Sequence, residues 1–190
     1  MRVIAGTLRR RVLEAPAGLA TRPTSDRLRE TLFNVLAPRM EGARFLDLYA
    51  GSGAVGIEAA SRGAAEVVLV ERAAPALKVL RGNLEKLGLR GQVRVEEVSV
   101  AAFLRRGRPS SSAMQFDVMF LDPPYDSAEE YALVLALLGG EALGLLADDA
   151  VVIAEHRRKE KLAERYGVLA RSRLLEQGDA ALSFYGAAIS

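Results

Sequence analysis

The sequence contains no cysteine, no tryptophan and one histidine, His156, among its 190 residues. Without cysteine the chain can form neither disulfides nor a thiolate metal site. A single histidine also argues against a histidine-based metal centre and against a Ser-His-Asp triad. We therefore expect no metal cofactor. The lack of cysteine also favours a cytoplasmic protein.

Long apolar runs are missing as well. No stretch approaches the roughly 20 apolar residues that a membrane-spanning helix needs, and the start, MRVIAGTLRRRV, lacks the apolar run of a signal peptide. We expect no membrane partner. The length suits one domain over residues 1–190, with a basic extension and helix over 1–40 and a core over 41–190. Nothing in the sequence demands a dimer, so we expect a monomer.

Positive charge is concentrated at one end of the chain. The net charge is +2, yet the segment 1–40 holds eight arginines and no lysine against Glu14, Asp26 and Glu30, a local charge of +5. The segment 41–190 therefore sums to −3. A positive segment on a near-neutral body favours contact with a polyanion. A solvated basic face would produce the same pattern.

The hydrophobic pattern predicts an α/β fold. The start reads as an extended arm or short hairpin over Val3–Ala15, followed by a loop and a helix over Asp26–Met40 that Thr24 or Ser25 caps. From Ala43 on, strand-like and helix-like segments alternate, which predicts a mostly parallel sheet with helices on both faces. The expected segments, in chain order, are Phe45–Tyr49, Ala54–Arg62, Glu66–Glu71, Ala74–Leu87, Gln92–Glu96, Val100–Arg106, Phe116–Leu121, Ala128–Leu138, Ala150–Glu155, Val168–Gln177 and Ala180–Ala187.

A rigid corner follows the buried strand Phe116–Leu121 and reads Asp122-Pro123-Pro124-Tyr125. Two prolines remove two backbone donors and fix two φ angles, so the strand must stop there. The corner presents a carboxylate, backbone carbonyls and an aromatic ring, which together could hold a flat, polar substrate. The alternative is a strand ended by a proline turn, with Tyr125 as a lid on the core.

A glycine turn, Asp47 to Gly53 (DLYAGSG), follows the first predicted strand. Gly51-x-Gly53-x-x-Gly56 matches the dinucleotide fingerprint, and Glu71 stands where that fingerprint asks for an acidic residue, so a nicotinamide or flavin enzyme stays open. Asp47 would repel a pyrophosphate, however, and hydride transfer does not need the proline corner. A cofactor with an ammonium group and a ribose fits better, with Asp47 near the cation and Glu71 on the ribose hydroxyls. Alternatively, Glu71 caps the following helix.

The glycine turn at 47–53 (DLYAGSG), followed further along the chain by DPPY at 122–125, resembles the S-adenosylmethionine-dependent amino-methyltransferases. RVIAGT at 2–7 and RPTSDRLRETLFNVL at 22–36 further resemble the 16S rRNA guanine-N2 methyltransferases of the RsmD family. This resemblance implies a Rossmann-like class I methyltransferase fold with a seven-stranded, mostly parallel sheet and a C-terminal antiparallel hairpin. It implies transfer of a methyl group from S-adenosylmethionine to the exocyclic N2 amine of one guanine in small-subunit rRNA, leaving S-adenosylhomocysteine.

The resemblance also implies roles for individual residues. Glu71 would bind the ribose, and Arg72 would lie beside the adenosine. Ser99 falls where related enzymes usually place Asp or Asn for the adenine amino group, and a hydroxyl does this less fully. The residues that would line the methionine part of the cofactor are Asp47, Tyr49, Gly51, Ser52 and Gly53.

In this interpretation the proline corner is a clamp for the target amine. Guanine N2 is a poor nucleophile because its lone pair is delocalised into the ring. The Asp122 carboxylate and the Pro123 carbonyl could accept its two N–H groups and direct the nitrogen, while Pro124 keeps the corner rigid. Tyr125 would stack on a base splayed out of the RNA. Either Asp122 or solvent takes the released proton.

The basic front end would follow the RNA backbone beside this clamp, with salt-dependent affinity. The expected partner is 16S rRNA within a small-subunit assembly particle. A second basic run, residues 156–161, could add to the surface. The predicted RNA-contacting side chains are Arg2, Arg9, Arg10, Arg11, Arg22, Arg27 and Arg29.

Three other functions stay open at this point. DPPY suits DNA adenine N6 as well, although 190 residues leave no obvious target-recognition domain. A NAD(P)-binding oxidoreductase would explain the glycine turn. A catalytically silent RNA-binding factor would explain the arginines.

Overall fold

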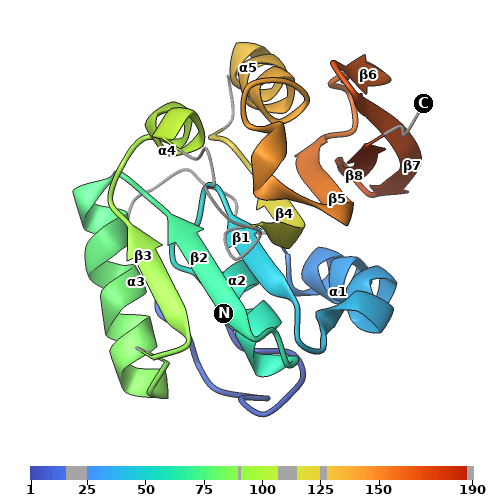
Figure 1. The fold of residues 1–190 in the computed structure, drawn as a ribbon. Helices are drawn as coiled ribbons and strands as arrows, with labels where there is room; N and C mark the ends of the chain where they lie inside the picture. Colours follow the sequence, from blue (N-terminus) through green and yellow to red (C-terminus); the bar gives the residue numbers. More distant parts are fainter. Residues whose placement is uncertain (16–24, 90, 107–114, 125–127, 188–190) are drawn as a thin grey trace. The chain divides into compact units, whose positions relative to one another are not determined.

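The computed structural model in Figure 1 describes residues 1–15, 25–89, 91–106, 115–124 and 128–187. It contains two compact units, residues 1–99 and 100–190. The expected extension, residues 1–40, lies in the first unit together with part of the expected core. A single domain over 1–190 stays a prediction.

The first unit contains an N-terminal arm, defined here as residues 1–15, and a three-stranded parallel sheet. The arm folds back on itself through an antiparallel bridge between Arg2 and Val12, which agrees with the expected hairpin. The sheet has the order β3-β2-β1. The elements are α1 (Asp26–Met40), β1 (Arg44–Asp47), α2 (Ala54–Ser61), β2 (Glu66–Val70), α3 (Ala74–Leu87) and β3 (Val93–Glu96).

Local sequence explains where the helices of this unit begin and end. The Ser25 hydroxyl accepts a hydrogen bond from the Leu28 N–H and caps α1, as one of the two predicted caps. α3 has its predicted bounds, and Gly88 ends it with a φ of 70°. Phe33 of α1 stacks on Phe45 of β1, with 6.1 Å between the ring centroids. α1 is therefore fixed against the sheet by an aromatic pair.

The second unit combines a parallel strand pair with an antiparallel extension. β4 pairs with β5 in parallel, and β5, β8, β7 and β6 follow one another as antiparallel neighbours. In Figure 1, β7 and β8 form the predicted C-terminal hairpin, coloured dark red. The elements are α4 (Val100–Arg106), β4 (Phe116–Leu121), α5 (Ala128–Leu138), η2 (Leu143–Leu145), β5 (Leu146–Arg157), β6 (Arg165–Tyr166), β7 (Leu169–Gln177) and β8 (Ala180–Ala187).

The predicted fold class is confirmed: the chain is an α/β protein with parallel strands and an antiparallel C-terminal part. Some details differ from the prediction; among them, β5 begins at Leu146 and not at Ala150. β5 extends to Arg157 because its end pairs with the start of β8 at Ala180. The short strand β6 was not predicted, and the described residues thus contain eight strands, seven of them longer than β6.

Among the described residues, the helices are all too short or too polar to cross a bilayer.

Candidate functional site

The glycine turn, residues 47–53, connects β1 to α2. Asp47 ends β1 and is only 1% exposed, whereas Gly51 is half-buried. Gly51 and Gly53 have φ values of 55° and 83°, which glycine adopts without strain. The Gly53 N–H donates to the Ala50 carbonyl at 2.7 Å and closes the turn directly before α2. The turn therefore places a buried carboxylate beneath accessible backbone.

Glycine allows close contact on one side of this turn and leaves room on the other. A Cβ at Gly53 would lie 2.4 Å from Leu80 Cδ1 of α3, and one at Gly56 would lie 2.2 Å from Leu69 Cδ2 of β2. At Gly51, no heavy atom of the described residues other than its chain neighbours comes within 4 Å of the corresponding position. The backbone at Gly51 thus faces space that a ligand can enter.

Glu71 follows β2 and joins the glycine turn to α3. Its Oε2 accepts from the Gly51 N–H at 2.9 Å, and its Oε1 accepts from the N–H groups of Arg72 and Ala73 at 2.8 and 2.7 Å. Ala73 is the N-cap residue of α3, so Glu71 also fixes the backbone directly before this helix. A carboxylate has about four acceptor positions. These bonds use three of them, and the fourth can accept a ligand hydroxyl.

Asp47 and Glu71 bring two carboxylates to the ends of neighbouring parallel strands. Ligands of such sheets bind beyond the carboxyl ends of the strands. Two negative groups beside open glycine backbone suit a ligand that carries an ammonium group and ribose hydroxyls, and they disfavour a pyrophosphate. The residues present therefore fit S-adenosylmethionine, the cofactor that the resemblance implies.

The remaining predicted cofactor residues lie in the same unit. Tyr49 is half-buried within the turn, and the Ser52 carbonyl accepts from the Asn83 side chain at 3.0 Å. Arg72 is exposed directly after Glu71. Ser99 is half-buried and follows β3, the third strand whose carboxyl end lies at this edge. The structure thus brings the turn and Glu71 into direct contact, while Arg72 directly follows Glu71 and Ser99 follows the neighbouring strand β3.

The proline corner follows β4 in the second unit. β4 is buried over residues 118–121, after which Asp122 is half-buried, Pro123 is buried and Pro124 is exposed. Tyr125 lies outside the described residues. The buried strand thus ends at Leu121, directly before Asp122, as predicted. The role of the corner as a clamp stays a prediction.

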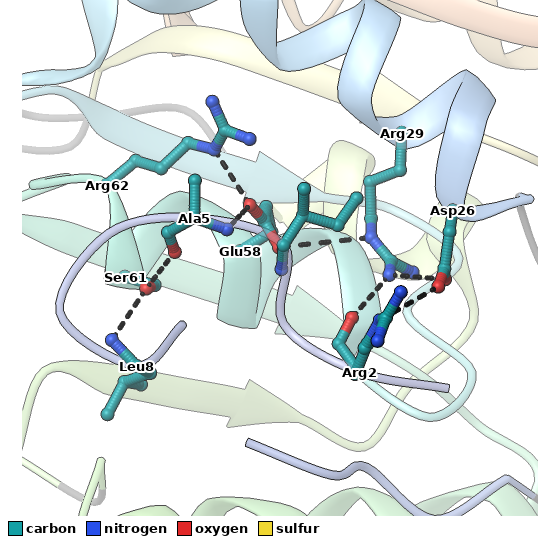
Figure 2. Close-up of polar contacts among 9 residues, drawn as sticks. Arg2, Ala5, Leu8, Asp26, Arg29, Glu58, Ser61 and Arg62 are labelled. Carbon is teal, nitrogen blue, oxygen red and sulfur yellow. Dashed lines mark hydrogen bonds and ion pairs between the residues drawn. The ribbon is translucent and has the colours of Figure 1, made fainter. Parts of the chain in front are cut away.

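Two buried polar side chains of α2 fasten the arm to the first unit (Figure 2). Glu58 accepts from the Ile4 N–H at 2.7 Å and from the Ala5 N–H at 3.0 Å. The Ser61 hydroxyl donates to the Ala5 carbonyl at 2.6 Å and accepts from the Leu8 N–H at 2.9 Å. These four bonds join parts of the chain that are far apart in sequence, so the arm is held in a defined conformation.

Arg29 of α1 belongs to the same buried network and corrects one prediction. Its guanidinium donates to Asp26 Oδ1 at 2.9 Å and to the Arg2 carbonyl at 2.6 Å, and its Nε lies 3.9 Å from Glu58 Oε2 (Figure 2). Arg62 Nε donates to Glu58 Oε1 at 2.8 Å. Because the Arg29 side chain has no exposed surface, the prediction that it contacts RNA is wrong.

The arm also carries three consecutive arginines, Arg9, Arg10 and Arg11, called the tip arginines here, and all three are exposed. Arg10 has a φ of 70°, in the left-handed region, and its N–H donates to the Val3 carbonyl at 2.9 Å. Within the described part of the chain, no acidic side chain pairs with a tip arginine. Their charge is therefore available to an external anion.

Arg2 and Arg27 are exposed as well. Arg2 Nε lies 3.8 Å from Asp26 Oδ2, a contact on the surface that solvent weakens. Arg22 lies outside the described residues. Five of the seven predicted arginines can therefore reach a surface ligand in the structure.

Sequence reasoning did not point to Glu58, Ser61 and Asn83, whose side chains hold the arm. Each is at most 2% exposed and lies on a helix. The signal was present, since Glu58 stands in the otherwise apolar AVGIEAAS and Asn83 lies one helical turn after Leu80 on the apolar stripe of α3. A polar residue on a buried stripe indicates an internal partner.

The single histidine lies in the second unit and is buried. His156 Nε2 lies 2.9 Å from Ser183 Oγ, and burial lowers the pKa of His156. The ring therefore belongs to the interior of the second unit. Among the described residues, no three His, Asp or Glu side chains gather as metal ligands.

Comparison with known proteins gives consistent matches over nearly the whole chain. The family model described as conserved hypothetical protein 95 matches residues 1–186. The Bacillus subtilis protein named "Putative rRNA methyltransferase YlbH" is 36% identical over 185 residues, which cover 97% of this chain and 98% of that protein. Ribosomal RNA small subunit methyltransferase D of Escherichia coli K12 is 40% identical over 158 residues, covering 82% of this chain and 74% of the relative.

A solved structure agrees with these matches. The Escherichia coli structure titled "Putative methyltransferase yhhF" superimposes with a TM-score of 0.84 at 32% identity. The superposition covers all of this chain and 99% of the other. The Rossmann-like class I architecture expected from the sequence is therefore shared with that structure over its whole length.

Proposed function

The chain belongs to the conserved hypothetical protein 95 family, the RsmD family of the sequence resemblance, and on this premise we propose that it methylates small-subunit rRNA. The proposed acceptor is the exocyclic N2 amine of one guanine in 16S rRNA, and the proposed donor is S-adenosylmethionine. The observation that carries the proposal is Glu71, whose carboxylate joins the Gly51 N–H to the start of α3 at the open glycine turn.

The residues of the glycine turn and their neighbours would hold the cofactor. Asp47 provides negative charge for the ammonium group of the methionine part, and the remaining acceptor position of Glu71 suits a ribose hydroxyl. Gly51 allows the ligand to approach the backbone. When bound, S-adenosylmethionine supplies an electrophilic methyl group. Arg72 and Ser99 would lie along the adenosine part.

The proline corner would hold the target base. The Asp122 carboxylate and the Pro123 carbonyl are two acceptors on a rigid segment, and an exocyclic amine has two N–H groups to offer. Accepting both orients the nitrogen and reduces the delocalisation of its lone pair, so that it can attack. Positioning of this kind contributes several kcal/mol without a covalent intermediate. Tyr125 would stack on the splayed base, and Asp122 or water takes the proton.

The exposed arginines of the first unit would bind the RNA backbone. Arg2, Arg27 and the tip arginines are surface cations, and phosphate contacts of this kind give salt-dependent affinity without reading sequence. The proposed setting is a cytoplasmic, monomeric enzyme that acts on a small-subunit assembly particle.

A methyl-transfer assay tests the proposal. The protein is incubated with S-adenosylmethionine carrying a tritiated methyl group and with unmethylated small subunits, naked 16S rRNA or DNA. We expect label in rRNA and N2-methylguanosine in its nucleoside digest. Label in DNA alone, or a different modified nucleoside, would reject the proposed acceptor. Titration calorimetry with S-adenosylhomocysteine and with NADH tests the donor, and binding of NADH alone would reject a methyltransferase.

Variants test the proposed clamp. Asp122→Ala is expected to lower the rate of methyl transfer roughly 10²-fold or more, because the amine is no longer oriented. Asp148→Asn is the matched control, since it removes an exposed carboxylate of the same unit. Full activity in Asp122→Ala would remove Asp122 from the site.

A further inference from the structure

Asn83 of α3 connects the N-terminal arm to the glycine turn. Its Nδ2 donates to the Ser52 carbonyl at 3.0 Å and to the Glu14 carbonyl at 3.1 Å, while its Oδ1 accepts from the Glu14 N–H at 2.9 Å. The residue is 1% exposed. The Asn83 amide is thus hydrogen-bonded to the N–H and the carbonyl of Glu14 in the arm and to the carbonyl of Ser52 in the turn.

α3 is well placed to fix this amide. Leu80 and Leu84 on the same face are buried, and Leu80 Cδ1 occupies the space in which a side chain at Gly53 would begin. Residues three and four apart lie on one face of a helix. Two successive turns of α3 therefore contact Gly53 and Ser52, and the amide has little freedom to move away.

The arm segment that Asn83 holds is continuous with the tip arginines. Glu14 follows shortly after Arg11, and between them Leu13 is buried and its N–H donates to the Met1 carbonyl at 3.0 Å. The Arg11 carbonyl in turn accepts from the Val3 N–H at 2.9 Å. The tip arginines and Glu14 therefore belong to one short segment whose backbone is hydrogen-bonded to the first residues of the arm.

We propose that Asn83 is a positioning residue that couples polyanion binding at the arm to cofactor binding at the glycine turn. The inference rests on the proposed function. RNA that holds the arm in place keeps Asn83 on the Ser52 carbonyl and thereby keeps the turn in the conformation that receives the cofactor. By linkage, the cofactor strengthens RNA binding by the same factor.

An amide is the group that this position requires. It offers two donors and an acceptor without charge, which matches two carbonyls and one N–H in a buried space. An aspartate would keep the acceptor for the Glu14 N–H but would set a carboxylate against two carbonyl oxygens. Asn83→Asp therefore preserves one bond to the arm and removes the bond to the turn, whereas Asn83→Ala removes all three.

Calorimetry on the intact protein tests the coupling. The affinity for S-adenosylhomocysteine is measured alone and with saturating 16S rRNA transcript. For the wild type we expect RNA to raise this affinity at least about fivefold, within the usual range of allosteric coupling. For Asn83→Ala we expect the RNA effect to fall below about twofold. We also expect a KM for S-adenosylmethionine that rises more than kcat falls.

Gln92 provides a matched control, because it has the same chemistry at another place. Its Nε2 donates to the Ala64 carbonyl at 2.6 Å and to the Ala60 carbonyl at 3.5 Å, beside the C-terminal end of α2. Gln92→Ala should keep the effect of RNA at about fivefold. An equal loss in Gln92→Ala would show that destabilisation alone abolishes coupling and would overturn the proposal.

Other outcomes separate this inference from the proposed function. A wild type that binds S-adenosylhomocysteine and methylates rRNA, but whose cofactor affinity RNA does not change, overturns the coupling and leaves the function intact. A wild type that does not bind S-adenosylhomocysteine overturns both. If Asn83→Ala does not fold, Asn83→Asp and the wild-type comparison decide, and full coupling in Asn83→Asp rejects the role of Asn83.

Discussion

Arg29 and Arg62 share the buried carboxylate of Glu58, to which the arm is hydrogen-bonded, whereas the tip arginines of the arm are exposed. A buried charge is costly unless it is paired and hydrogen-bonded, so Arg29 and Arg62 serve to fold the arm. Exposed charges contribute little to stability, and those at the tip can bind an external polyanion. Burial, and not residue type, therefore separates structural from ligand-binding arginines here.

The largest effect is expected from removing the shared carboxylate. Glu58→Ala should lower the free energy of unfolding by about 3–5 kcal/mol, because Arg29 stays buried without its carboxylate and two arm N–H groups lose their acceptor. Urea denaturation measures this loss. Glu97→Ala removes a half-exposed partner of Arg81 and should cost no more than about 1 kcal/mol. Equal losses in the two variants would contradict the distinction between buried and exposed pairs.

A smaller loss is expected when a neutral anchor is removed. Ser61→Ala deletes one donor and one acceptor that hold the arm, and it should cost about 1–3 kcal/mol. The same denaturation experiment applies. Ser172→Ala removes an exposed hydroxyl bond to the Phe184 carbonyl and should stay within about 0.5 kcal/mol. If Ser61→Ala is as mild as this control, the arm is not held through Ser61.

The tip should respond in the opposite direction. Arg10 has a φ of 70°, a conformation that costs an L-residue about 1–2 kcal/mol. A glycine at this position would remove that cost, but part of the resulting gain in stability is offset by the greater conformational entropy of the unfolded chain. Arg10→Gly should therefore raise the free energy of unfolding by up to about 1 kcal/mol. Arg9→Gly removes the same charge at a residue whose φ lies outside the left-handed region. It should not stabilise the protein. An equal gain in the free energy of unfolding in both variants would therefore contradict strain at Arg10.

The smallest effect on stability is expected from neutralising the tip. Replacing all three tip arginines by glutamine should change the free energy of unfolding by no more than about 0.5 kcal/mol. RNA binding, measured by fluorescence anisotropy across a salt series, should weaken. Its logarithmic salt slope should become shallower by about 0.7–0.9 for each phosphate that the variant no longer neutralises. Lys78→Gln with Lys86→Gln, which removes exposed charge from α3, should change the slope less. An unchanged slope in the tip variant would exclude the arm from RNA binding.

Much of the fold could be predicted because the hydrophobic pattern of each segment agrees with the burial of its residues in the structure. α3 has its predicted bounds because its apolar stripe ends where Gly88 adopts a positive φ. The glycine turn could be located because a positive φ and close approach restrict the residue type. The short strand β6 could not be predicted, because its two residues form a strand only through their pairing with the start of β7.

The partners of the polar side chains were not predictable in the same way. In the sequence, Arg29 is one arginine of the basic N-terminal segment, just as the tip arginines are. It differs from them because Glu58, on a different helix, lies beside its buried side chain. Asn83 of α3 contacts Glu14 in the arm and Ser52 in the glycine turn, both distant from it in sequence. Such contacts depend on how the helices pack on the sheet. The residues that surround each side chain in the sequence do not determine that packing.

The length of the chain between the arm and its anchors has a consequence for the order of folding. The arm leaves the ribosome before α2, yet its contacts to Glu58 and Ser61 span the whole of α1 and β1. The contacts require α2, and closing so long a loop is expected late in folding. A kinetic analysis of Ser61→Ala should show mainly faster unfolding and little change in the folding rate. During synthesis the arginine-rich segment is therefore an unanchored cationic tail until α2 has formed.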